Sequence, residues 1–333
     1  MTVPTNTDQT FTQTNTREDL EDLIYNVDPF RTPILNMAKK GSAKQTYHEW
    51  DVDGLAAQNA ANAAVQGDNP TNIALTATGR MGNYTQISTK TVQLSGTLQS
   101  VVAAGGTNKM GYQLMKKAKE LKRDMEGVLT ANTAKSAGNS TTAAYSAGLP
   151  TFVATNDYFL TTGTPGANPT GAGAYVTIGS ENFFAGGVVR TDCSNKAAIT
   201  ETNVKTVLQL IYTNSGDSPE YCVLSPTNKQ IVSTFTTTSS TRFVKVEDAV
   251  LQTKIDTYES DFGDVKMVPD IFLARSRDVY FINPNYLRVD YLRPFQTIPL
   301  AKTGDSDQKM LLAEYCLEVC NEHALGAYYD TTG

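Results

Sequence analysis

Residues 46–95 carry the feature from which the architecture can be predicted. They read TYHEWDVDGLAAQNAANAAVQGDNPTNIALTATGRMGNYTQISTKTVQLS. Thr46–Val52 and Tyr84–Ser95 have strand character, and the second of them mixes polar and apolar side chains in alternation. The residues between them are rich in Ala, Asn and Gln and contain few large apolar side chains. The pattern predicts two strands joined by a long connection.

Connections of this length are uncommon in compact domains unless they are functional, disordered or covered by something else. Residues Gly54–Gly79 have too few large apolar side chains to form a core of their own. We therefore expect a long hairpin arm that lies on another molecule.

Residues 107–132 follow with the strongest helical pattern in the chain. Apolar side chains recur along it at helical spacing, and its predicted core residues are Met110, Leu114, Leu121, Met125 and Leu129. The pairs Lys116–Glu120 and Lys122–Glu126 place opposite charges four residues apart, on the face expected to meet solvent. Because a helix rises about 1.5 Å per residue, this one should span about 38 Å and pack one face on a sheet.

The sequence before the arm predicts little compact structure. Residues 1–16 are polar and Thr-rich, and Arg17–Asn26 has the pattern of a short acidic helix. The dipeptides Asp28-Pro29 and Thr32-Pro33 should end any helix there.

The second half of the chain mixes helices and strands. Leu149–Leu160 is strand-like, Thr200 should cap a helix that Gly216 ends, and Ser225-Pro226 should open another after a short strand. From Phe243 onward strand patterns dominate and finish with Leu311–Val319. The expected fold class is α+β.

Composition excludes several functions. The formal net charge of −6 argues against sequence-independent DNA binding, which needs a basic surface. No apolar stretch approaches the roughly 20 residues of a membrane span, and the N-terminus lacks the features of a secretory signal. Four cysteines without a CxxC motif fit free thiols in a reducing compartment, so the chain should act inside a cell or leave it by lysis.

No constellation of residues supports catalysis, and we expect no cofactor and no metal site. Cys316, Cys320 and His323 have the spacing C-x3-C-x2-H, but in a strand the two sulfurs would lie about 13 Å apart, too far for one zinc ion. His48, in a predicted strand beside Trp50, is interpreted as structural. The basic residues of the long helix alternate with acidic ones, which favours a solvated or interface face.

The order of these parts resembles the major capsid proteins of tailed bacteriophages, with their Hong Kong 97-type fold. Local passages are also similar to one group of these proteins. The similarity covers most of the chain from Arg17 and is weakest at about 160–200. The passages that carry it are REDLEDLIYNVDPFRTPILNMAKKGSAKQTYHEWDVDGL (Arg17–Leu55), YTQISTKTVQLSGT (Tyr84–Thr97), YQLMKKAKELKRDMEGVL (Tyr112–Leu129) and AGLPTF (Ala147–Phe152).

The resemblance implies a division of the chain into named parts. These are an N-terminal arm (1–46), an extended E-loop (47–96), a peripheral domain with the long spine helix (97–144), an α/β axial domain (about 145–265) and a β-rich return mostly to the peripheral domain (266–333). It also implies a subunit that forms hexamers and pentamers of an icosahedral head around double-stranded DNA, without sequence-specific DNA binding. Scaffolding, portal and decoration proteins would be separate chains.

The expected location is the virion, after assembly in the host cytoplasm and without a membrane partner. Large side chains of the two arms are then the candidates for contact with neighbouring subunits, because aromatic residues contribute a disproportionate share of interface energy. The candidates are Phe30, Tyr47, Trp50, Ile73, Leu75, Arg80 and Tyr84. Two other self-assembling roles stay open, an encapsulin-like compartment shell and a tail-tube subunit. An enzyme would need a polar cluster in a pocket, which the sequence does not indicate.

Overall fold

The structure is a computed structural model, and it describes residues 28–29, 31–69, 72, 75–101, 109–159, 165–179, 181–196, 198–235 and 256–332. Four sequence predictions lie outside the described residues: the acidic helix at 17–26, the side chains of Phe30 and Ile73, and the strand at 244–250.

Helices and strands alternate irregularly along the chain, as expected for an α+β fold. The helices are α1 (Pro33–Met37), α2 (Gly96–Ser100), α3 (Lys109–Thr130), α4 (Glu201–Ser215) and α5 (Pro226–Ser233), with short 3-10 turns at Leu149–Thr151 and Glu322–Ala324. The strands are β1 (Lys39–Ser42), β2 (Tyr47–Val52), β3 (Gly79–Tyr84), β4 (Gln86–Ser95), β5 (Asp157–Tyr158), β6 (Tyr175–Ile178), β7 (Glu181–Phe184), β8 (Tyr221–Leu224), β9 (Thr257–Ser260), β10 (Gly263–Pro269), β11 (Val279–Ile282), β12 (Leu287–Pro299), β13 (Ser306–Val319) and β14 (Gly326–Tyr328). No described helix has both the length and the apolar character required to cross a bilayer.

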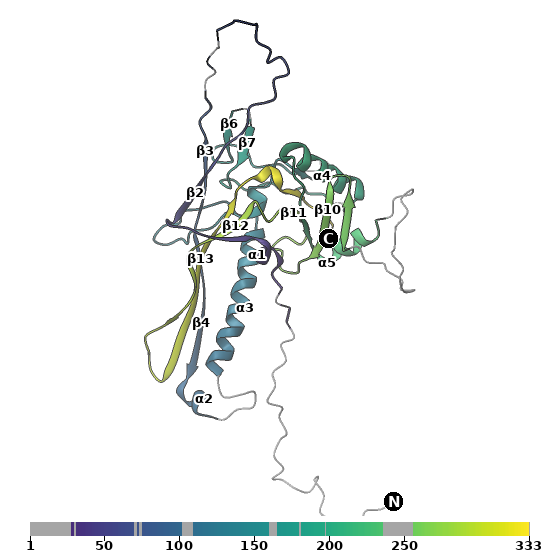
Figure 1. Ribbon diagram of the computed structural model, residues 1–333. Helices are drawn as coiled ribbons and strands as arrows, with labels where there is room; N and C mark the ends of the chain where they lie inside the picture. Colours follow the sequence, from purple (N-terminus) through teal and green to yellow (C-terminus); the bar gives the residue numbers. More distant parts are fainter. Residues whose placement is uncertain are drawn as a thin grey trace, which may run out of the picture.

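A four-stranded sheet with the order β1-β12-β13-β4 runs alongside α3 (Figure 1). Strand β13 pairs antiparallel with β12 on one side and with β4 on the other, so the predicted strand Leu311–Val319 is confirmed and extended. Residues 311–319 are all buried. The chain therefore covers this part of β13 on both sides.

Helix α3 confirms the predicted long helix, and its 22 residues span about 33 Å. Leu121, Met125 and Leu129 are fully buried in the main apolar core. Met110 and Leu114 are only half-buried, so the predicted core face holds for the C-terminal half and weakens toward the N-terminal half.

The other large sheet has six strands in the order β5-β14-β11-β8-β10-β9. Alternate residues of β11 separate its two faces: Val279 and Phe281 join the apolar cluster formed with α4 and α5, whereas Tyr280 and Ile282 join the cluster that includes α3. The predicted caps of α4 and α5 are confirmed, because Thr200 and Ser225 each accept a backbone hydrogen bond at a helix start.

Two strand predictions were wrong. The partner of β2 is β3, Gly79–Tyr84, rather than Tyr84–Ser95. The chain leaves the hairpin at Thr85 and continues as β4 in the four-stranded sheet. Glycines at positions 79 and 82 weakened the strand pattern of β3, and the continuous alternation after Tyr84 concealed the change of sheet. The strand-like segment Leu149–Leu160 contributes only a 3-10 turn and the two-residue β5.

The predicted pair Lys122–Glu126 is also wrong. Glu126 is fully buried, and its two carboxylate oxygens accept hydrogen bonds from the backbone N–H groups of Ile34 (2.7 Å) and Leu35 (2.8 Å). It therefore docks α1 onto α3, although Ile34 lies 92 residues away in the sequence. Burial, together with the charge of Asp270, raises the pKa of Glu126 to about 8. On the solvent face, Lys117 pairs with Glu120 instead of the expected Lys116.

Leu121→Ala tests the gradient of burial along α3. Truncation of a fully buried leucine costs about 3–5 kcal/mol of unfolding free energy, because a cavity remains. We expect Leu114→Ala, at the half-buried end of the same face, to cost about 1–2 kcal/mol. Denaturant unfolding of both variants measures the difference, and equal losses would contradict the assignment of the core.

Glu126→Ala tests the contact between α1 and α3. Two buried N–H groups would lose their acceptor, at a cost of about 1–3 kcal/mol each. Glu120→Ala is the matched control on the same helix, since its ion pair with Lys117 is partly exposed and worth about 0–1 kcal/mol. The two unfolding free energies should differ clearly, and similar values would show that Glu126 does not hold α1.

The raised pKa of Glu126 gives its contribution to stability a defined pH dependence. A carboxyl group whose pKa is raised on folding contributes fully below its ordinary value of 4.5, and this contribution is lost as pH rises toward about 8. Glu126→Gln cannot titrate. The wild-type chain should therefore lose stability relative to this variant between pH 5 and pH 8, measured by denaturant unfolding. A constant difference across that range would contradict the expectation.

Candidate functional site: the hairpin arm and its base

Residues 53–78 connect β2 to β3, and we call them the distal loop. Its described residues, 53–69, 72 and 75–78, form no helix or strand, and all but Gly54 are exposed. Figure 1 shows the loop projecting away from the sheets. Leu55 and Leu75 are 96% and 99% exposed, and Val65 is 75% exposed. These three aliphatic side chains are therefore open to solvent, and their contact with another molecule stays a prediction.

The base of the arm, formed by β2 and β3, packs against its own chain. The Tyr47 and Tyr84 rings lie 4.5 Å apart, and Trp50 lies beside the core residue Phe152 at 6.3 Å between ring centroids. Lys135 donates hydrogen bonds to the Tyr47 hydroxyl (3.3 Å) and to a backbone carbonyl of β3 (2.7 Å). Burial lowers the pKa of this lysine. These contacts make the base a rigid mount for the distal loop.

Arg80 lies on the outer side of the base. Its guanidinium is 3.8 Å from the Glu49 carboxylate and 4.0 Å from that of Asp51, and all three side chains are exposed. Exposed pairs at these distances stabilise a fold little. Loss of these two ion pairs would therefore cost the fold little stability.

Asn83 fixes the base to the four-stranded sheet. It is fully buried and uses both ends of its amide: the nitrogen donates to Ser146 Oγ (3.0 Å) and to the Leu317 carbonyl (2.8 Å), and the oxygen accepts from the backbone N–H groups of Ala147 and Tyr84 (both 2.9 Å). A buried amide with all these bonds made orients the strand that carries it. It joins β3 to β13 across 234 residues of sequence.

A cluster of three polar side chains, also at the base, joins β2 to the four-stranded sheet. His48 Nε2 lies 3.0 Å from Glu318 Oε2 and 3.5 Å from Asp290 Oδ2. Burial and the neighbouring Glu318 carboxyl raise the pKa of Asp290 to about 8. His48, Asp290 and Glu318 form the one set of three or more such side chains among the described residues whose ligand atoms lie close enough to hold a metal ion.

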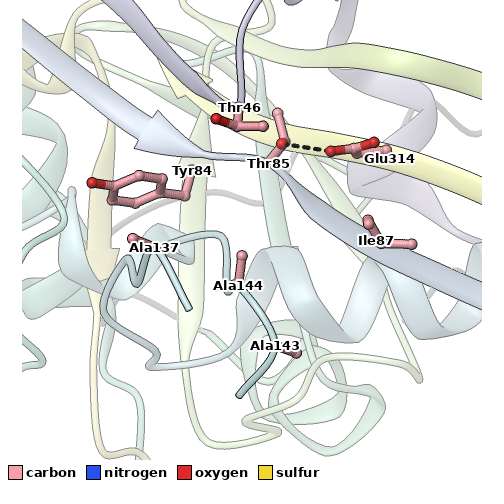
Figure 2. Close-up of a pocket in the computed structure, with 8 residues that line it drawn as sticks. All are labelled: Thr46, Tyr84, Thr85, Ile87, Ala137, Ala143, Ala144 and Glu314. Atoms are coloured by element: carbon pink, nitrogen blue, oxygen red, sulfur yellow. Dashed lines mark hydrogen bonds between the residues drawn. The ribbon is translucent and has the colours of Figure 1, made fainter. Parts of the chain in front are cut away.

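A hollow of about 320 Å³ opens where the base meets β4, as Figure 2 shows. Its lining is Thr46, Tyr84, Thr85, Ile87, Ala137, Ala143, Ala144 and Glu314. The one carboxylate in this lining, Glu314, already accepts hydrogen bonds from Thr85 Oγ1 (2.9 Å) and Arg293 Nε (2.6 Å). The hollow therefore offers shape and apolar surface rather than a free reactive group.

The cysteine predictions are partly corrected. None of the four cysteines, all of which the structure describes, forms a disulfide, as expected, and burial raises the pKa of the Cys316 thiol. Strand β13 ends at Val319, so Cys320 lies beyond the strand register assumed from the sequence. Its thiol lies 3.2 Å from Glu318 Oε1.

The structure brings four of the predicted contact residues, Tyr47, Trp50, Arg80 and Tyr84, together at the base of the arm and leaves Leu75 on the distal loop. Their contact with a neighbouring subunit stays a prediction. Sequence reasoning missed Asn83 and Glu126 as structural anchors, because their partners lie far along the chain and leave no local pattern.

A family model and a curated relative both identify the chain as similar to major capsid proteins. The family described as SU10 major capsid protein matches residues 3–332. A curated relative, the major capsid protein of Escherichia phage Phieco32, is 36% identical over 109 residues. That alignment covers 33% of this chain and 31% of the relative, so the matched part is about a third of the relative's length.

Solved structures, two of them described as capsids, share the fold at low sequence identity. The capsid of a native GTA particle aligns with a TM-score of 0.59 and 13% identity over 96% of both chains. The capsid asymmetric unit of cyanophage A-1(L) aligns with a TM-score of 0.60 and 13% identity, over 98% of this chain and all of the other. A structure from Mycobacterium phage Adephagia aligns with a TM-score of 0.58 and 9% identity over 98% of this chain.

Proposed function

The chain belongs to the SU10 major capsid protein family, and from this premise we propose that it is the shell subunit of a phage head. Subunits would assemble into hexamers and pentamers, and these into an icosahedral shell that encloses double-stranded DNA. Membership of this family implies a structural role rather than an enzymatic one. An encapsulin-like compartment or a tail tube is not favoured, because the relatives and the structural neighbours are phage or GTA capsid proteins.

The proposed parts follow the Hong Kong 97-type pattern. The hairpin arm would be the E-loop, α3 the spine helix of a peripheral domain, and the six-stranded sheet with α4 and α5 the axial domain. The chain before α1 would be the N-terminal arm that runs along another subunit. Because β4 pairs with β13, Gln86–Ser95 belongs with the sheet beside α3, and only the part of 47–96 before it would form the E-loop.

The observation that carries the proposal is the contrast between the distal loop and its base. The base is held by buried contacts to the same chain, including those of Asn83 and Trp50. The loop exposes Leu55, Val65 and Leu75 and packs against nothing in its own chain that would hide them. A rigid mount with an uncovered apolar tip is what a subunit needs in order to reach a neighbour.

Closed shells arise when one chain makes heterologous contacts that close by symmetry. Each contact can be weak, because a subunit within a lattice must break many contacts at once to leave. A projecting loop enlarges the buried interface without enlarging the folded domain. Assembly would take place in the host cytoplasm, with scaffolding, portal and decoration proteins as separate chains, and the DNA would be held without recognition of its sequence.

Deletion of Ala56–Thr78 tests the role of the distal loop. It would leave Asp53-Gly54-Leu55 between β2 and β3, a short turn that suits a hairpin. We expect a folded subunit with nearly unchanged thermal stability that forms no capsomers or shells. Circular dichroism measures the fold, and light scattering with negative-stain microscopy measures assembly.

The matched control keeps the loop length and changes only its apolar side chains, as Leu55→Ser with Leu75→Ser. This variant should assemble at a higher protein concentration than the wild-type chain, because hydrophobic contact is lost without loss of reach. Normal shells from the deletion variant would refute the role of the loop. A wild-type chain that stays monomeric at every concentration would refute the capsid assignment itself.

A further inference from the structure

The group at the base of the arm joins three strands that are distant in sequence. His48 comes from β2, Asp290 from β12 and Glu318 from β13. The three ligand atoms, one imidazole nitrogen and two carboxylate oxygens, all lie within 4.8 Å of one another. The group therefore converges on one point, at the place where the hairpin arm meets the four-stranded sheet.

One of these atoms has no hydrogen-bond partner among the described residues. Asp290 is 2% exposed, and its Oδ2 is buried without a partner while it faces His48 Nε2 at 3.5 Å. Its other oxygen packs against Gly41, where a β-carbon would lie only 1.7 Å from Oδ1. Because any side chain at Gly41 would collide with it, the carboxylate is confined, with Oδ2 directed toward the histidine.

Among the described residues, one arginine approaches the two carboxyl groups of the cluster. Two buried carboxyl groups lie side by side, and Arg288 approaches only Oε1 of Glu318, at 3.7 Å, with a side chain that is 46% exposed. Burial of two adjacent carboxylates is costly unless a cation or a proton compensates them. The unpartnered oxygen lies 3.5 Å from His48 Nε2, so both atoms could serve the same cation as ligands.

We propose that His48, Asp290 and Glu318 bind a divalent transition-metal ion, Zn²⁺ in preference to Mg²⁺ or Ca²⁺. In a tetrahedral zinc site with ligands at about 2.0–2.1 Å, neighbouring ligand atoms lie about 3.3 Å apart. The separations from His48 Nε2, 3.0 Å to Glu318 and 3.5 Å to Asp290, are close to that value. Water would take the fourth position.

The ligand types decide the selectivity. Imidazole nitrogen suits zinc and other late transition metals, whereas Mg²⁺ and Ca²⁺ prefer sites made of oxygen ligands alone. A metal held by β2, β12 and β13 together would clamp the hairpin arm to the sheet. The clamp depends only on the fold of one chain, so it does not rest on the proposed capsid function.

Zinc binding by the full-length chain tests the proposal. The chain is first treated with EDTA and desalted, and Zn²⁺, Mg²⁺ or Ca²⁺ chloride is then titrated by calorimetry. After a further desalting step, metal content is measured by mass spectrometry. We expect about one retained Zn²⁺ per chain and a rise in melting temperature of about 3 °C or more, with no comparable effect of Mg²⁺ or Ca²⁺.

His48→Gln should weaken zinc affinity at least about tenfold and abolish the thermal shift, since a site of three ligands loses its nitrogen. His323→Gln is the matched control, because it changes the one other histidine of the chain, which also lies near carboxylates, and it should leave both readouts unchanged. Asp290→Asn, similar in shape, provides a second variant if His48→Gln is poorly folded without metal. Zinc affinity that is absent in the wild-type chain, or equal in wild type and both site variants, would overturn the proposal.

Discussion

The fold depends on strand β13, which has a paired strand on each side. It bonds to β12 on one side and to β4 on the other, and Tyr315, Leu317 and Val319 join the core that also holds α3. Over Lys309–Tyr315 both neighbours pair with it, so a shift in register there would break two ladders at once. The long sheet and α3 therefore form one rigid body.

The hairpin arm gains its direction from the same strand. Three polar contacts reach β13 from the start or the base of the arm: Asn83 to the Leu317 carbonyl, Thr85 to Glu314, and His48 to Glu318. A buried polar group that has found its partner is costly to separate, so these contacts hold the arm at one angle. The described residues of the distal loop make no such contacts with β13. The loop is placed in space by its base, while its own side chains stay uncovered.

This division accounts for what the sequence could predict. Local signals sufficed for α3, for the capped helices α4 and α5, and for a hairpin with a long uncovered connection, because periodicity and capping depend on nearby residues. They failed where a distant partner decided the outcome. Glu126 looked like a surface residue until Ile34 and Leu35 were placed beside it, 92 and 91 residues away.

The base of the arm was the least predictable part for the same reason. His48 and Glu318 are 270 residues apart, so no spacing rule could join them. The spacing in the sequence that is similar to a metal motif, Cys316-Cys320-His323, includes none of the three clustered residues. The change of sheet at Thr85 was missed because strand periodicity continues across it without interruption. Among the expected contact residues, local sequence could identify large side chains on the arm but could not separate those of its base from those of its tip.

The central claim is that the distal loop is covered by a neighbouring copy of the chain. Hydrogen–deuterium exchange of residues 55–78, compared between assembled particles and dissociated subunits, tests it most directly. The account predicts rapid exchange in the free subunit and much slower exchange in the particle, while the base of the arm is protected in both. Equally rapid exchange of the loop in both states would contradict it.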